Sequence, residues 1–289
     1  MAPSPTPAPE GWITAFGRAA DAVVGVLHAA AEAGTALTRE TGSRGAGGDR
    51  TLVIDADAEA AIFDVLDGLH RDGARFTALS EERGLVDYGS PDVLVLIDPI
   101  DGSTNAKRGL PHHAVSLALA TGPDVAARGT MADVACGLVA DLGSGERWTA
   151  IRGAGARLDG APLRGPERER RSADGRLELV AIESADPRNV LASGDALAAS
   201  VHRLRAIGAL ALALCWVGGG RVDAMASLWR CRAIDVAAGQ LVVRESGGLV
   251  AFGDGPDPLA APLDLEPHVP VVAARSAEGL ADARALPAR

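Results

Sequence analysis

Aromatic and basic residues are scarce in this chain. Of its 289 residues only 3% are aromatic, and 28 lysines and arginines stand against 38 aspartates and glutamates, for a net charge of -10. A protein of this charge repels a phosphate backbone unless basic side chains gather locally. The nearest candidate, residues 167–171, mixes glutamates with arginines and is typical of a solvated loop. We therefore expect no nucleic-acid partner, whereas small phosphorylated metabolites stay open as substrates.

Cysteines and long apolar runs are scarce as well. Cys136, Cys215 and Cys231 are odd in number and widely spaced, which supports neither a disulfide framework nor a thiolate zinc site, so a cytoplasmic location fits best. Residues 1–10 lack the basic segment and apolar run of a signal peptide, and we expect a disordered tail there. The apolar segment 207–217 is too short to span a bilayer and is followed by three glycines, so we expect no membrane association.

Apolar residues, at 47%, are frequent enough for a sizeable core in one large domain or two closely packed smaller ones. Their helical spacing at residues 12–37 and 58–69 predicts two helices, and the glycine-rich residues 41–49 between them predict a mobile loop. Apolar or alternating runs predict strands at 114–120, 135–140, 146–151, 177–182 and 269–273, and helices at 208–217 and 234–245.

A polar, charged stretch at residues 162–174 separates the predicted elements into two groups. Such stretches are typical of boundaries between compact units. We expect an N-terminal subdomain at residues 11–170 and a C-terminal subdomain at residues 171–289.

The clearest chemical signal follows a run of apolar, β-branched residues at 93–97, which predicts a strand covered on both faces. Asp98 and Asp101 come directly after it, and Pro99 restricts the turn so that both carboxylates can face one ion pair. Gly102 lets a ligand approach the backbone, and Gly-Ser-Thr-Asn at 102–105 predicts a helix opening whose N–H groups accept a phosphate. Taken alone, these residues fit equally well an ordinary turn in which Asp101 or Ser103 caps a helix.

Two further acidic segments favour chemistry over an ordinary turn. Glu81 and Glu82 precede the buried strand in Ser-Glu-Glu-Arg-Gly, and Asp235 stands among small apolar residues in Ala-Ile-Asp-Val-Ala-Ala-Gly. An acid in such surroundings is costly unless something neutralises it. Because all candidate ligands are hard oxygens and no soft cluster exists, magnesium is the metal that fits them.

These three segments, in this order, resemble the inositol monophosphatase and fructose-bisphosphatase superfamily, with its Glu-Glu segment, its Asp-Pro-Ile-Asp-Gly-Ser/Thr signature and its Asp-Val-Ala-Ala-Gly segment. Weaker matches, such as Gly109-Leu-Pro, extend the resemblance over residues 48–253. The sequence around Asp55 and Glu81 is most similar to that of the branch that includes dual inositol-phosphate and fructose-bisphosphate phosphatases. The resemblance implies an α/β fold, a layered αβαβα sandwich with the site between its subdomains, and a homodimer.

The resemblance also implies the metal ligands. Glu81, Asp98 and the Ile100 carbonyl would bind one Mg²⁺, and Asp98, Asp101 and Asp235 a second, so that Asp98 bridges the two. Two or three ions per site are expected, with Mn²⁺ as a substitute. The N-terminal subdomain would carry most of these ligands, and the C-terminal one would supply Asp235 and substrate contacts. Lithium would inhibit at the second metal position.

The catalytic residues that the resemblance implies are Asp55, Ser103 and Glu81. Asp55 and the Ser103 hydroxyl would orient and deprotonate a water activated by the metals. That water would attack phosphorus in line while the amides of Gly102 and Ser103 hold the phosphate. The expected activity is that of a magnesium-dependent phosphoric monoester hydrolase.

The substrate is less constrained. Inositol monophosphatases usually carry a glutamate seven residues before the last metal aspartate, and Leu228 stands there, which argues against strict inositol specificity. Gly208 and Ala209 are expected substrate contacts, and Arg230 and Arg232 could meet a second phosphate or a nucleotide, or face solvent. We expect an inositol phosphate or sugar phosphate as substrate. The alternatives within the superfamily are a fructose-1,6-bisphosphatase and a nucleotide or 3'-phosphoadenosine phosphatase.

Two rival functions use other features. Residues 52–57 resemble the start of a haloacid-dehalogenase-type phosphatase with Asp55 as nucleophile. The motif of that family, however, has Thr or Val at the position that Glu59 occupies in this chain. A non-catalytic ligand-binding member would require lost metal acids, and none is lost. Glu59 and Glu82 could support the metal ligands from behind or be plain surface acids, and we expect surface acids. We expect His112 and His113 to pack or line the cleft rather than bind metal.

Overall fold

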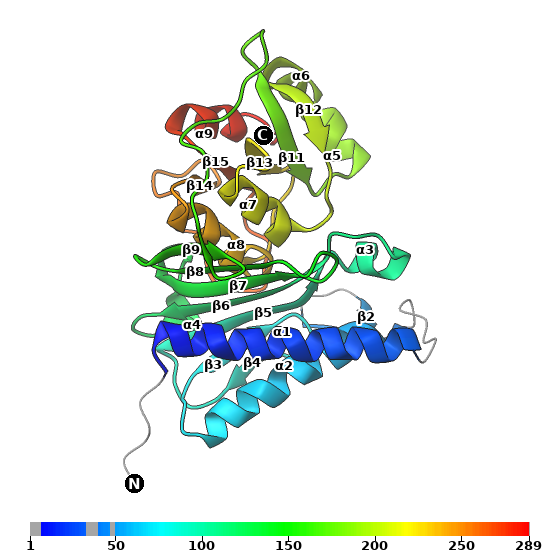
Figure 1. Ribbon diagram of the computed structural model, residues 1–289, viewed down its shortest axis with the longest axis vertical. Coiled ribbons are helices and arrows are strands. Elements are labelled where there is room, and N and C mark those ends of the chain that lie inside the picture. The colour runs from blue at the N-terminus through cyan, green and yellow to red at the C-terminus, as the bar shows by residue number, and fades with distance from the viewer. Residues whose placement is uncertain (1–6, 33–39, 47–49, 289) are drawn as a thin grey trace.

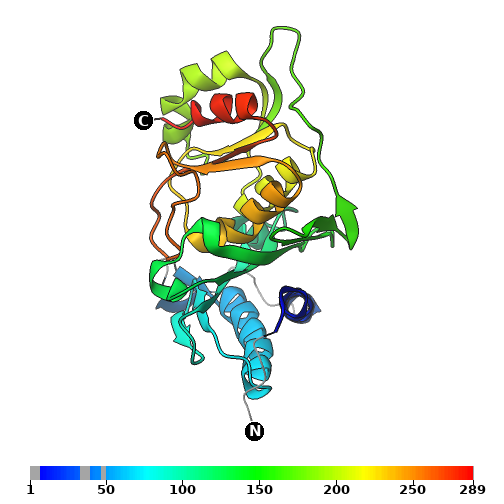
Figure 2. The same cartoon turned by 90° about the vertical axis from the view of Figure 1, so that its left-hand side faces the viewer.

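The computed structural model describes residues 7–32, 40–46 and 50–288, and within these ranges helices and sheets alternate in five layers (Figure 1 and Figure 2). The first layer is α1 (Pro9–Glu32) and α2 (Val53–Arg71), which cover one face of an eight-stranded sheet. Helices α7 (Leu210–Gly218) and α8 (Ala233–Glu245) lie between that sheet and a five-stranded one. On the outside are α5 (Pro187–Ala192), α6 (Gly194–Ser200) and α9 (Ala277–Arg284). The expected αβαβα sandwich is confirmed.

The eight-stranded sheet has the order β10-β9-β8-β7-β6-β5-β3-β4, in which only the β3–β5 pair is parallel. Its strands are β3 (Thr77–Ser80), β4 (Gly84–Asp87), β5 (Val93–Asp101), β6 (Ala114–Thr121), β7 (Val134–Asp141), β8 (Arg147–Ile151), β9 (Gly155–Leu158) and β10 (Ala161–Leu163). Helices cover both faces of β5, β6 and β7, so these strands are almost entirely apolar. Two short elements, α3 (Ser103–Arg108) and α4 (Val125–Arg128), follow β5 and β6.

The five-stranded sheet has the order β12-β11-β13-β15-β14, with β11 parallel to both β12 and β13. Its strands are β11 (Leu177–Glu183), β12 (Val201–Arg205), β13 (Ala224–Ser227), β14 (Leu249–Phe252) and β15 (Val271–Ala274). Between the sheets, α7 and α8 pack so closely that a Cβ atom on Gly239 would lie 2.9 Å from the Leu214 side chain. This contact explains the small residues that follow Asp235 in the sequence.

Helix α1 meets a length and composition criterion for a membrane-crossing helix, although it includes the charged residues Arg18 and Asp21. Core helices of soluble proteins meet the same criterion. Here Trp12 and Phe16 are buried, and the Trp12 ring packs edge-on against Phe76 at 5.3 Å. This side of α1 therefore belongs to the protein core.

The structure differs from the sequence-based elements mainly near the N-terminus. Helix α1 begins at Pro9, so the end of the expected tail at residues 1–10 is helical, and residues 1–6 lie outside the described ranges. Part of the expected loop at 41–49 forms β1 (Glu40–Arg44), which pairs with β2 (Arg50–Leu52), while residues 47–49 are not described. The expected strand at 93–97 continues to Asp101 as β5. The division into two subdomains stays a prediction, and residues 164–176 connect the two sheets.

Candidate active site

The residues expected to bind metal and phosphate line one pocket of about 470 Å³. They come from the first turn of α2, the β3–β4 turn, the end of β5, the start of α3, and the first turns of α7 and α8. The lining residues are Asp55, Glu81, Glu82, Asp98, Ile100, Asp101, Gly102, Ser103, Thr104, Lys107, Leu210, Arg232 and Asp235. Segments up to 180 residues apart in sequence therefore meet at one end of the eight-stranded sheet.

A bulge in β5 places Asp98 and Asp101 on the same side. Asp98 pairs with Ser116 and Asp101 with Ala114, so β5 holds one more residue than β6 over this stretch. In a regular strand, residues three apart point to opposite faces of the sheet. The extra residue, rather than the turn expected from Pro99, brings both carboxylates into the pocket.

Asp98 and Asp101 are held as buried carboxylates, 2% and 7% exposed. The Asp98 carboxylate accepts a hydrogen bond from the Ile100 amide at 3.1 Å, and Asp101 accepts from the amides of Leu210 and Ala211 at 3.1 and 2.7 Å. Burial and then repulsion by neighbouring acids raise the pKa of Asp98, and burial followed by repulsion from Asp235 raises the pKa of Asp101. A cation placed beside them would remove that repulsion.

Arg232, expected to contact substrate or to face solvent, instead lies among the metal-ligand candidates. Its guanidinium forms ion pairs with Glu81 at 2.7 Å and with Asp235 at 3.1 Å, and its side chain is only 18% exposed. Burial opposes its charge, but Asp235 and Glu81 outweigh burial and raise its pKa. The solvent-facing alternative is therefore wrong for Arg232. Arg230 is exposed, outside this pocket, and lies over the Trp229 ring at 5.7 Å.

Glu59 holds the turn that carries Glu81, so its expected role as a surface acid was wrong. Its carboxylate is 2% exposed and accepts hydrogen bonds from the amides of Glu82 and Arg83 at 3.1 and 3.3 Å and from the Ser80 hydroxyl. It also forms an ion pair with the Arg83 guanidinium at 3.2 Å. Glu59 therefore ties α2 to the β3–β4 turn.

Asp55 and Glu59 are four residues apart on α2 and so share one face of that helix. This spacing was the sequence signal that could have identified Glu59. Because residues 53–57 are helical, Asp55 does not follow a strand of the central sheet, which removes the main support for the dehalogenase-type reading.

Two residues that the sequence-based reasoning left out position the segment 207–210 against the pocket. The Glu183 carboxylate, 2% exposed, accepts from the amides of Ile207 and Gly208 at 3.1 and 2.9 Å, and burial raises its pKa to about 7. The Asn105 side chain donates to the carbonyls of Ile207 and His112, both at 2.8 Å. These contacts orient the start of α7, whose amides bind Asp101.

Gly208 and Ala209 do not line the pocket, although they lie directly behind it. A Cβ atom on Gly102 would lie 3.0 Å from the Gly208 carbonyl oxygen and 3.2 Å from the Ala209 side chain. Gly102 also has a φ of 85°, a conformation that favours glycine. The expected contact of Gly208 and Ala209 with substrate therefore stays a prediction.

The two histidines expected to pack or line the cleft are outside the lining of this pocket. The His112 ring packs edge-on against Trp216 at 5.3 Å, and burial lowers the pKa of His113. Leu228, at the position of the missing glutamate, is buried in the core of the five-stranded sheet.

The lining of the pocket fits hard divalent cations. Six of its residues are acidic, and two, Lys107 and Arg232, are basic. Among the described residues no three Asp, Glu, His or Cys side chains are gathered closely enough to ligate one ion, and the Arg232 guanidinium lies between two of the expected ligands. The donor set itself, carboxylates and the Ile100 carbonyl, is the kind that magnesium prefers.

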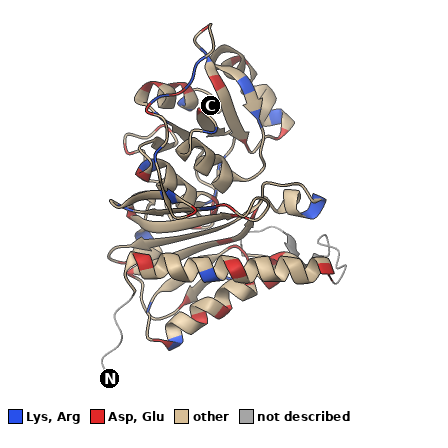
Figure 3. Cartoon of the chain, viewed as in Figure 1, with Lys and Arg blue, Asp and Glu red and all other residues tan. Residues whose placement is uncertain are grey.

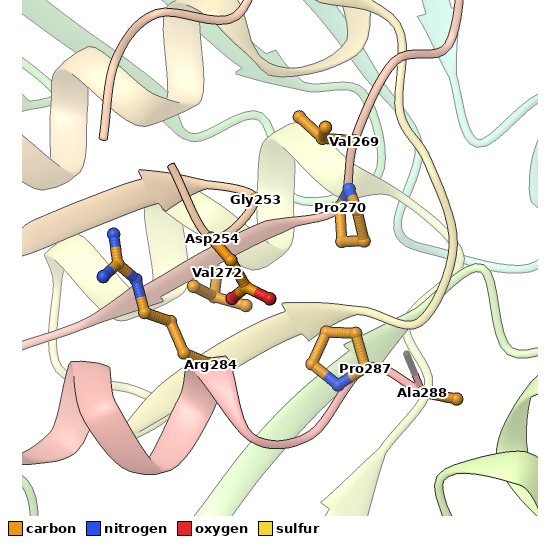
Figure 4. A pocket seen from close by; sticks show the side chains of 8 residues that line it. All are labelled: Gly253, Asp254, Val269, Pro270, Val272, Arg284, Pro287 and Ala288. Atoms are coloured by element: carbon orange, nitrogen blue, oxygen red, sulfur yellow. The ribbon is translucent and has the colours of Figure 1, made fainter. Parts of the chain in front are cut away.

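A second pocket, of about 310 Å³, lies between α9 and the strands β14 and β15 (Figure 4). It is lined by Gly253, Asp254, Val269, Pro270, Val272, Arg284, Pro287 and Ala288. Its lining is mainly apolar and includes none of the expected site residues. The residues expected to carry the chemistry line the acidic pocket instead.

Comparisons with known proteins identify relatives over most of the chain. The model of the inositol monophosphatase family matches residues 10–287. The chain is 31% identical over 222 residues to the fructose-1,6-bisphosphatase/inositol-1-monophosphatase of Methanothermobacter thermautotrophicus, covering 75% of this chain and 76% of the relative. It is 33% identical over 210 residues to Nus factor SuhB of Pasteurella multocida, covering 72% and 73%.

The fold agrees as well. The crystal structure of the extragenic suppressor protein suhB from Bartonella henselae aligns with a TM-score of 0.75 and 26% identity, over 96% of this chain and 98% of the other. The family match spans nearly the whole chain and includes every segment that lines the acidic pocket. The chain therefore belongs to the inositol monophosphatase family.

Proposed function

We propose that this protein is a magnesium-dependent phosphatase that hydrolyses a small phosphomonoester. Its family supports phosphatase activity. The observation that carries the proposal is the meeting of Glu81, Asp98, Asp101 and Asp235 in one pocket, with Asp98 and Asp101 buried and mutually repelling. Buried acids of like charge are retained at such a cost where they bind cations or perform acid–base chemistry.

In this mechanism Glu81, Asp98 and the Ile100 carbonyl would hold one ion, and Asp98, Asp101 and Asp235 would hold a second. When bound, magnesium would neutralise phosphate oxygens and lower the pKa of the attacking water. Mn²⁺ would substitute, and lithium would inhibit by competing at the second position.

Side chains and backbone amides of the same pocket would carry out the remaining steps. Asp55 and the Ser103 hydroxyl orient the attacking water and take its proton, because both line the pocket that holds the acids. The amides of Gly102 and Ser103 hold the phosphate in line for attack, and no covalent enzyme intermediate is required. Lys107, which also lines the pocket, adds a positive charge on the side of α3.

For the substrate we propose an inositol phosphate or sugar phosphate, with a fructose bisphosphate or a nucleotide as the alternatives. One observation favours the nucleotide alternative. Trp229, 55% exposed, lines an open hollow of about 690 Å³ at the carboxyl ends of β11 and β13, and Arg230 lies over its ring. The Cα atoms of Trp229 and Arg232 can be at most about 11 Å apart, so a base stacked there would be within reach of the metals.

The protein would act in the cytoplasm, as a homodimer, without a nucleic-acid or membrane partner. Lysines and arginines are spread over several elements rather than gathered on one helix or sheet face (Figure 3). Some relatives are named Nus factor SuhB. The competing hypothesis is therefore that this protein is a non-catalytic, ligand-binding member of the family.

The test is phosphate release from a panel of inositol phosphates, fructose 1,6-bisphosphate, other sugar phosphates and nucleotides, with and without Mg²⁺. Wild type is compared with Asp98→Asn, and Trp229→Ala is added for the nucleotides. Magnesium-dependent turnover that Asp98→Asn abolishes would support the proposal, and a selective loss on nucleotides in Trp229→Ala would identify the substrate class. No turnover on any ester would favour the binding protein.

A further inference from the structure

Arg232 joins two metal-ligand candidates that come from distant parts of the chain. Glu81 lies in the turn between β3 and β4, and Asp235 lies in the first turn of α8, which packs between the two sheets. The Arg232 guanidinium contacts Glu81 Oε1 at 2.7 Å with one terminal nitrogen and Asp235 Oδ1 at 3.1 Å with the other. One cation therefore bridges ligands that the mechanism assigns to two different metal ions.

Arg232 makes further contacts with Asp235 at the start of α8. Arg232 directly precedes α8, and its backbone amide donates to Asp235 Oδ2 at 3.3 Å. Its Nε atom adds a contact of 3.4 Å to the same oxygen. The guanidinium also lowers the pKa of Asp98, which Glu81 and Asp235 raise. Arg232 is thus a basic group that offsets the mutual repulsion of these acids.

We propose that Arg232 is an internal counter-cation that magnesium must displace. In the metal-free protein it would stabilise Glu81, Asp98 and Asp235, and metal binding would exchange one cation for another at Glu81 and Asp235. A magnesium ion bound at about 2.1 Å to these carboxylates would stand close to the guanidinium, and the two positive charges would repel each other. The inference rests on the proposed metal sites.

Magnesium affinity measured without substrate tests this exchange. Isothermal titration calorimetry with MgCl₂ would compare wild type, Arg232→Gln and Arg232→Lys, with Arg230→Gln as the matched control from the same loop. Thermal unfolding in EDTA would be recorded for each. We expect Arg232→Gln to bind Mg²⁺ at least tenfold more tightly and to melt at a lower temperature in EDTA, because the acids lose their counter-cation. Arg232→Lys should lie between wild type and Arg232→Gln, and Arg230→Gln should match wild type.

The outcomes separate this inference from the proposed function. Magnesium affinity in Arg232→Gln equal to or weaker than that of wild type would overturn the inference, because no competing cation would have been removed. An unchanged melting temperature in EDTA would overturn it as well. If wild type and every variant bind no magnesium, the proposed function fails, and the melting temperatures in EDTA still decide whether Arg232 stabilises the acids.

Discussion

Replacing Glu59 with alanine would test whether the turn that carries Glu81 depends on one buried carboxylate. The change removes the acceptor for the amides of Glu82 and Arg83 and for the Ser80 hydroxyl, and it breaks the ion pair with Arg83. Each buried donor left without an acceptor costs about 1–3 kcal/mol. The Arg83 side chain is 43% exposed and can be hydrated, so the lost ion pair adds little.

We therefore expect the free energy of unfolding to fall by about 3 kcal/mol in Glu59→Ala. At roughly 2–4 °C per kcal/mol, the melting temperature would drop by about 6–12 °C. Asp57→Ala is the matched control, because Asp57 is exposed and lies two residues away on the same helix. Urea and thermal unfolding measure the stability, and calorimetric titration with Mg²⁺ measures whether Glu81 is still presented.

Surface substitutions usually change the free energy of unfolding by less than about 0.5 kcal/mol. The reasoning would be refuted if the free energies of unfolding of Glu59→Ala and of the Asp57→Ala control differed by less than that. Glu59→Gln separates charge from shape, because its amide oxygen can still accept from one of the backbone donors. A stability between those of wild type and Glu59→Ala is expected for it.

Three further predictions follow from groups in or behind the pocket. Asp98→Asn should raise the melting temperature in EDTA, because it removes a buried charge that three acids repel, and calorimetry should detect weaker Mg²⁺ binding. Gly102→Ala should lower the free energy of unfolding by about 1–3 kcal/mol, measured in urea, because φ is 85° and the new Cβ would lie 2.9 Å from the His112 carbonyl oxygen. Burial raises the pKa of Glu183 from 4.5 to about 7, so the native state binds more protons than the unfolded state between these values. Stability should therefore fall as pH rises through that window, by up to roughly 3 kcal/mol, and urea unfolding of Glu183→Gln across the same pH range should show a smaller fall.

Local pattern predicted the central strands and the acids of the pocket, whereas the layered arrangement was expected from the family resemblance. Continuous apolar runs identified β5, β6 and β7, and the Asp-Pro-Ile-Asp segment identified Asp98 and Asp101. The orientation of those two carboxylates was attributed to Pro99, whereas it depends on the register between β5 and β6. Register is a property of two strands, and one segment alone does not reveal it.

The contacts of Glu59 and Arg232 join segments that are distant in the chain, so local pattern did not reveal them. Glu59 contacts residues 21 to 24 positions away, and Arg232 contacts Glu81 at a separation of 151. A charged residue on a helix or in a loop is usually solvated, so a surface position was expected for Glu59 and was one of the two alternatives for Arg232. Only the folded chain shows which of them lies among buried acids.

The bulge at Asp98 and Asp101 makes the length of this segment matter as much as its composition. Deleting one residue between the two aspartates would restore a regular strand, in which residues two apart still share a face, but it would remove the extra residue of the bulge, the stretch of β5 from which Ile100 lines the pocket. Ile100 contributes its backbone carbonyl to the proposed site, so other apolar residues of similar volume should be tolerated at position 100. Variation among functional relatives at this point should therefore preserve the number of residues between the aspartates more strictly than the identity of the side chain at position 100.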